Sequence, residues 1–148
     1  MKHGVILCGA TDIGKDTVTT ALTERDARYR FHLIGSPGPC DIDRQGLSEL
    51  LADGFVPVVH VDQPGAVDAV KGLVGEVRWT VVLLVADLAS ARARAIGHGT
   101  ADGPAACEAT PAVVFTATLA TAHLTPGETA GYIDTAVRMR ERLFGAAG

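Results

Sequence analysis

The chain has 148 residues, of which 47% are hydrophobic, 20% charged and 5% aromatic, and its formal net charge is −4. A chain of this length and apolar content can fold as one domain with its own core, so intrinsic disorder is excluded. The acidic balance and the few aromatic residues argue against nucleic acid as a partner, because such partners need basic and base-stacking surfaces.

Short apolar segments alternate with helix-like segments along the chain. Strands are expected over 5–8, 29–34, 56–61, 79–86 and 113–119, and helices over 13–25, 44–53 and 64–74. Asp87 can cap a further helix, 98–111 is expected to form a lid loop, and a last helix begins at Pro126 behind a Thr125–Glu128 capping box. Strands apolar on both faces indicate a parallel sheet covered on both sides. We therefore expect a three-layer α/β fold with a five-stranded parallel sheet, and residues 1–148 as a single domain.

The sequence shows no pattern typical of a membrane span, a signal peptide or a disulfide-bonded protein. No apolar run reaches the roughly 18 residues of a membrane span, and the apolar stretch at the start is too short for a signal peptide. The three cysteines, Cys8, Cys40 and Cys107, are widely spaced and indicate neither a disulfide framework nor a zinc site. These features predict a cytoplasmic protein with no membrane partner, and they leave a homodimer open.

A phosphate-binding motif directly follows the first strand. Residues 9–17 read GATDIGKDT, a G-x-x-x-x-G-K pattern between an apolar strand and an amphipathic helix. Gly9 and Gly14 allow the backbone N–H groups to turn toward a phosphate, and Lys15 can reach the terminal phosphates. We expect nucleotide binding by these residues together with Thr11, Asp12, Ile13, Asp16 and Thr17. The alternative is a glycine-rich turn with a solvated lysine.

Two aspartates are candidate magnesium ligands. Asp16 stands where such loops normally carry Ser or Thr, whose hydroxyl contacts the metal. Its carboxylate can coordinate Mg²⁺ directly or through water, or it can repel phosphate. Asp62 ends an apolar strand, and it is expected either to hold Mg²⁺ through water or to cap the helix that follows.

Three segments resemble the guanylate-kinase-like branch of P-loop nucleoside monophosphate kinases. They are the motif at 9–17, the strand and turn at 54–66 that end in Asp62 and Gly65–Ala66, and the strand at 79–86 followed by Arg92 and Arg94. The resemblance implies a P-loop kinase fold, ATP and Mg²⁺ as cofactors, and a lid arginine that stabilises the transferred phosphoryl group. Arg92 is the favoured lid arginine.

The sequence departs from this family where the phosphate acceptor would bind. Only nine residues, 35–43, separate the second strand from Arg44, and no Lys or Arg occurs over 96–111. This length is too short for a separate acceptor-binding lobe. Asp41 and Asp43 in this connection can orient the acceptor hydroxyl or serve turn and capping roles, and Asp12 can be functional or solvated.

Together these features predict an ATP-dependent kinase that phosphorylates the hydroxyl of a small molecule, such as a nucleoside or a natural-product intermediate. Its partners would be a nucleoside triphosphate and the small-molecule acceptor. The catalytic candidates are Lys15, Asp41, Asp43 and Arg92. The alternatives are a non-catalytic nucleotide-binding module and an NTPase. His60 is expected to be packed rather than catalytic.

Overall fold

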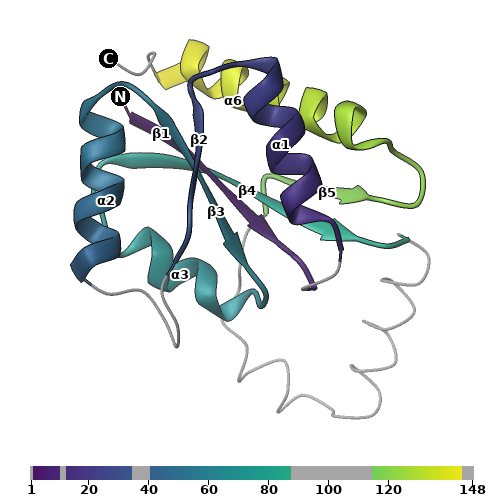
Figure 1. The fold of residues 1–148 in the computed structure, drawn as a ribbon, viewed down its shortest axis with the longest axis horizontal. Helices are drawn as coiled ribbons and strands as arrows, with labels where there is room; N and C mark the ends of the chain where they lie inside the picture. The colour runs from purple at the N-terminus through teal and green to yellow at the C-terminus, as the bar shows by residue number, and fades with distance from the viewer. Residues whose placement is uncertain (1, 11–12, 35–40, 88–114, 145–148) are drawn as a thin grey trace.

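A computed structural model describes residues 2–10, 13–34, 41–87 and 115–144. It contains strands β1 (Lys2–Cys8), β2 (Tyr29–His32), β3 (Val56–Val61), β4 (Val77–Val85) and β5 (Ala117–Ala120). The helices are α1 (Lys15–Arg25), α2 (Asp41–Ala52), α3 (Gly65–Lys71) and α6 (Pro126–Phe144). The five strands form one sheet in the order β2-β3-β1-β4-β5, and every pair is parallel (Figure 1). The predicted α/β fold with a five-stranded parallel sheet is confirmed.

Helices cover both faces of this sheet. Alternate residues of β1 point to opposite sides: Val5 and Leu7 belong to one buried cluster and Ile6 and Cys8 to the other. The first cluster is closed by α1 and α6, which lie side by side in Figure 1. The second is closed by α2 and α3. The three predicted layers are therefore present, and Cys8 is a small buried hydrophobe.

Several element boundaries differ from the expected ones for local reasons. Helix α1 starts at Lys15 rather than at residue 13, because Gly14 has a φ of 101°, outside the range of helical residues. Helix α2 starts at Asp41 rather than Arg44, with two acidic residues in its first turn, where the helix dipole favours negative charge. Strand β5 starts at Ala117. The preceding Thr116 donates its N–H to the Val81 carbonyl, and its hydroxyl oxygen accepts from the Val81 N–H.

Helix α6 is fixed at its start and near its middle. At its start the Thr125 hydroxyl accepts from the Glu128 N–H at 3.1 Å, and the Glu128 carboxylate accepts from the Thr125 N–H at 3.0 Å, so the predicted capping box is confirmed. Further along, the Asp134 carboxylate accepts hydrogen bonds from Tyr29, Arg25 and Arg138. These bonds tie α6 to the end of α1 and the start of β2. Among the described residues, no helix is long and apolar enough to span a membrane.

The carboxyl ends of β1 and β3 bring the motif and Asp62 together. Cys8 and Val61 are partners in the parallel register, and the Gly9 N–H donates to the Val61 carbonyl at 3.1 Å. The turn after β1 and the residue after β3 consequently lie at the same edge of the sheet. This is the edge at which open α/β sheets bind their ligands.

Candidate nucleotide-binding site

The glycines of the motif shape the turn between β1 and α1. A Cβ atom on Gly9 would lie 2.9 Å from the Leu84 carbonyl oxygen and 2.9 Å from Ile13 Cγ2, so only glycine fits this close approach. Gly14 adopts the left-handed conformation that L side chains rarely take. Both glycines therefore serve the backbone geometry that the motif predicted. Thr11 and Asp12 lie outside the described residues.

Lys15 is buried at the centre of this turn. Its ammonium group donates to the Gly9 carbonyl, to the Ala10 carbonyl at 3.2 Å and to Asp62 Oδ1 at 2.7 Å. Three acceptors satisfy the three N–H groups of the ammonium, which is why its burial is tolerated. A phosphate entering the turn would compete for the same donors. The structure thus places Lys15 in the turn of the motif, and its role in nucleotide binding stays a prediction.

Asp62 is placed by β3 and turned toward the motif. Its side chain is 62% exposed and pairs with Lys15, while the first turn of α3 has no side-chain cap. The helix-cap alternative for Asp62 is therefore not what the structure shows. The exposed carboxylate edge is free to meet a cation at the sheet edge.

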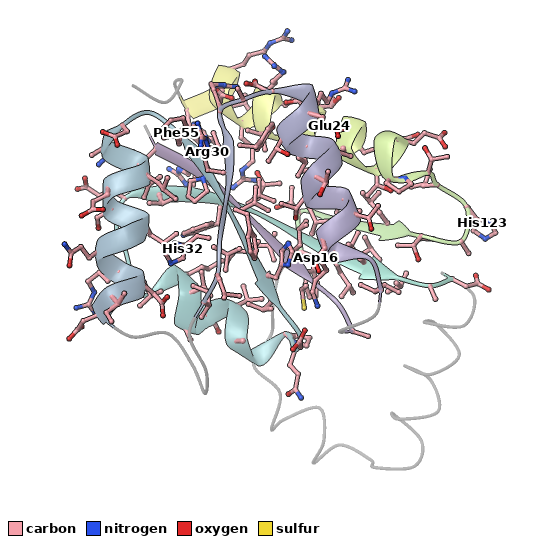
Figure 2. All side chains as sticks on the ribbon, in the orientation of Figure 1. Asp16, Glu24, Arg30, His32, Phe55 and His123 are labelled. Atoms are coloured by element: carbon pink, nitrogen blue, oxygen red, sulfur yellow. The ribbon has the colours of Figure 1, made fainter. Side chains whose placement is uncertain are left out.

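Asp16 and His60 meet beside Lys15. Asp16 lies in the first turn of α1 (Figure 2), with its side chain 96% exposed. Its Oδ1 is 3.6 Å from His60 Nδ1. The Thr19 hydroxyl donates to the Lys15 carbonyl at 2.8 Å, so at 2.6 Å it accepts from His60 Nε2–H. Burial lowers the pKa of His60. The neutral ring is therefore favoured.

Magnesium fits the donors at this edge. The carboxylates of Asp16 and Asp62 are hard oxygen ligands of the kind that Mg²⁺ prefers. Among the described residues, no group of three or more His, Cys, Asp or Glu side chains is arranged to hold a metal unaided. A Mg²⁺ ion held by these two carboxylates would take its remaining ligands from water and from substrate phosphates, as Mg²⁺ commonly does in proteins.

Two hollows flank the first turn of α1, and Asp16 borders both. The recess, of about 250 Å³, lies between this turn and the ends of β2 and β3. Lys15, Asp16, His60 and Asp62 supply its polar atoms, and Phe31, Leu33 and Ile34 form its apolar wall. The groove, of about 440 Å³, lies between α1 and the start of α6 and includes Thr17, Thr20, Pro126 and Gly127.

The other predicted catalytic residues lie away from these hollows or outside the described chain. Asp43 is buried, and its Oδ1 is 3.3 Å from Nε2 of His32, which lies on the α2 side of the sheet (Figure 2). Asp41 is exposed at the start of α2 and pairs with Arg44 at 3.3 Å. These contacts favour the capping and packing roles over the catalytic one. Arg92 lies outside the described residues.

The sequence reasoning missed the apolar half of the recess. His60 is packed as expected, since its ring contacts Phe31 with centroids 4.6 Å apart, but it also borders the recess. Phe31 lies in edge strand β2 and Leu33 directly follows it, and their exposed fractions are 43% and 74%. Two large apolar residues just before a glycine- and proline-rich connection were the signal available.

Comparisons with known proteins bear on the fold. No protein-family model and no curated protein matches the sequence. Among solved structures, the chain is similar to a de novo designed PLOOP2X3_50 fold protein, with a TM-score of 0.59 and 9% identity over 100% of both chains. A gluconokinase from Sinorhizobium meliloti 1021 matches with a TM-score of 0.55 and 16% identity, over 96% of this chain and 95% of the other. The chain has the P-loop NTPase fold.

Proposed function

We propose that this chain is an ATP-dependent phosphotransferase that phosphorylates the hydroxyl group of a small molecule. The observation that carries the proposal is the Lys15–Asp62 pair, which lines the recess beside the P-loop. A lysine can bind the phosphates of a metal–nucleotide complex, and a carboxylate can bind its metal. The recess and the groove, which flank the first turn of α1, leave room for an acceptor and a donor.

The donor nucleotide is assigned to the groove side. The P-loop amides and the start of α1 would hold its phosphates, and Thr17, which borders the groove, can donate to a phosphate oxygen. Lys15 would exchange its carbonyl partners for the terminal phosphates. Asp16 and Asp62 would hold Mg²⁺, which neutralises charge on the phosphates when it is bound.

The acceptor is assigned to the recess. Its hydroxyl oxygen would attack the γ-phosphorus in line, a P–O bond would form, and the bond from the γ-phosphorus to the bridging oxygen would break. ADP would leave and the hydroxyl proton would pass to water. Most of the acceleration would come from positioning and charge stabilisation, as in other phosphoryl transfers. A distant relation to guanylate-kinase-like enzymes, carried by the segments at 9–17, 54–66 and 79–86, is part of the proposal.

The proposal is tested by Lys15→Ala, with ATP and with GTP, in an assay of phosphorylated product across an acceptor panel. Lys2→Ala is the matched control, because Lys2 is an exposed lysine at the opposite end of β1. We expect product from the wild type and the control and none from Lys15→Ala. Undiminished turnover in Lys15→Ala would contradict the proposal.

A second candidate is a nucleotide-binding module without turnover. Asp16 favours it, because a carboxylate at the position of the usual metal-binding hydroxyl can repel phosphate. Tight nucleotide binding with no product on any acceptor would favour this candidate. Formation of ADP at the same rate with and without acceptor would instead support an NTPase.

A further inference from the structure

We propose that the recess selects an acceptor alcohol with an apolar, ring-sized body and no acidic group. This inference rests on the proposed function and names the substrate class of the same site. The inference distinguishes this chain from kinases whose acceptor carries a phosphate, such as the resembled family. It also distinguishes the chain from kinases whose acceptor is a sugar acid.

The apolar wall is the first observation. Phe31 lies in edge strand β2 and Leu33 directly follows the strand, and they remain 43% and 74% exposed beside the P-loop. Large apolar residues that are exposed beside a hollow often mark a ligand-binding surface, because covering them with a ligand makes binding more favourable. One side of the Phe31 ring contacts the His60 ring, with centroids 4.6 Å apart.

The charge of the recess is the second observation. Its described lining has one ammonium group, that of Lys15, against the two carboxylates of Asp16 and Asp62. The ammonium is already bonded to Asp62 and to two backbone carbonyls. No arginine borders the recess among the described residues. A phosphate or carboxylate on the acceptor would therefore meet net negative charge, to which a bound nucleotide adds more.

The size of the recess is the third observation. A volume of about 250 Å³ accommodates one ring with a short substituent rather than a nucleotide. The carboxylates of the recess come from the first turn of α1, at Asp16, and from the residue after β3, Asp62, whereas the apolar side chains come from β2 and the residues that follow it. An alcohol would consequently orient with its ring against Phe31 and Leu33 and its hydroxyl toward the phosphates.

The test measures ligand binding by NMR, in the full chain with a non-hydrolysable ATP analogue and Mg²⁺, and so does not depend on turnover. The probes are 2-phenylethanol, its acidic analogue 4-(2-hydroxyethyl)benzoate, GMP and gluconate. We expect 2-phenylethanol to bind at least about tenfold more tightly than the three anions. Equal or tighter binding of any anion would overturn the inference.

Three variants locate the binding. Leu33→Asn should weaken 2-phenylethanol binding by about 3- to 10-fold, the effect of losing part of one leucine contact. Leu143→Asn on α6 is the matched control, because Leu143 has the same 74% exposure, and it should change nothing. Leu33→Arg should tighten binding of the benzoate probe. An equal effect of both asparagine variants would overturn the assignment to the recess.

The two proposals fail in distinguishable ways. Loss of selectivity for 2-phenylethanol, with nucleotide binding that depends on Lys15 retained, would overturn the acceptor class alone. Absence of nucleotide binding, measured separately with the ATP analogue, would overturn the proposed function on which the acceptor class rests.

Discussion

Lys15 and Asp62 lie 47 positions apart in the sequence, yet Lys15 Nζ and Asp62 Oδ1 are 2.7 Å apart. The parallel pairing of β1 with β3 brings them together, since it places the turn after Cys8 beside the residue that follows Val61. The lysine side chain is 6% exposed and the aspartate side chain 62% exposed. To bind a phosphate, the buried lysine would therefore have to give up its contact with Asp62. The exposed Asp62 carboxylate would remain accessible to a metal ion.

Asp62→Asn should separate nucleotide binding from turnover. Without the carboxylate, Lys15 loses its charged partner and the negative charge near the phosphates falls, so metal-free ATP should bind more tightly. Turnover with Mg²⁺ should fall by about 100-fold or more, because charge stabilisation of the transferred group is weakened. Calorimetric titration and a product assay measure the two effects.

The matched control for this variant is Asp68→Asn, an exposed aspartate on α3. It should change neither quantity. Unchanged turnover in Asp62→Asn would contradict a role for this carboxylate in the reaction.

Gly14→Ala should distort the phosphate-binding turn. Gly14 has a φ of 101°, and an L residue held in the left-handed region costs about 1–2 kcal/mol. We expect a loss of unfolding free energy of about that size, together with weaker nucleotide binding, because the amides and the start of α1 shift. Chemical denaturation and nucleotide titration check this.

Gly65→Ala is the control for Gly14→Ala. A Cβ atom on Gly65 meets nothing within 4 Å, and Gly65 has no positive φ. Equal effects of the two substitutions would show that backbone conformation at Gly14 is not the cause.

The sequence predicted the features that depend on local pattern. Gly9, Gly14 and Lys15 follow from a spacing that the P-loop backbone requires, and the capping box of Thr125 and Glu128 follows from hydrogen bonds three residues apart. The parallel sheet followed from strands apolar on both faces. In each case the sequence pattern that determines the feature lies within one turn or one strand.

Contacts between distant elements could not be read in the same way. Asp43 looked equally suited to acceptor binding and to capping, and its burial against His32 depends on how α2 packs on β2. The partnership of His60 with Thr19 joins β3 to α1. The apolar wall at Phe31 depends on the tertiary packing that sets the end of β2 beside the P-loop.

Acid should weaken the attachment of α6 through Asp134. Burial raises the pKa of this carboxyl, but hydrogen bonds from Tyr29, Arg138 and Arg25 outweigh burial and hold the pKa below its ordinary value of 3.8. The group therefore adds stability that is complete above the unfolded-state pKa and is lost as pH falls through the lower folded-state pKa.

Asp134→Asn isolates this contribution. At pH 7 the variant should be less stable than the wild type by about 1–3 kcal/mol, the range for hydrogen bonds to a charged group. The difference should shrink as the pH is lowered below about 4. Urea denaturation at several pH values measures it, with the exposed Asp53→Asn as control. A difference independent of pH would show that ionisation of Asp134 is not the cause.

Asp16 should be a magnesium ligand rather than a residue that only repels phosphate. Its exposed carboxylate borders both the groove and the recess, at the position where P-loops usually supply a hydroxyl to the metal. In Asp16→Ala, metal-free ATP should bind more tightly, while the Mg²⁺ concentration for half-maximal turnover should rise about tenfold, since one oxygen ligand is lost. Asp16→Ser restores the usual hydroxyl and should keep the wild-type Mg²⁺ requirement, because serine retains an oxygen ligand. Titration of Mg²⁺ at fixed ATP compares the three proteins, and an unchanged Mg²⁺ requirement in Asp16→Ala would show that this carboxylate does not bind the metal.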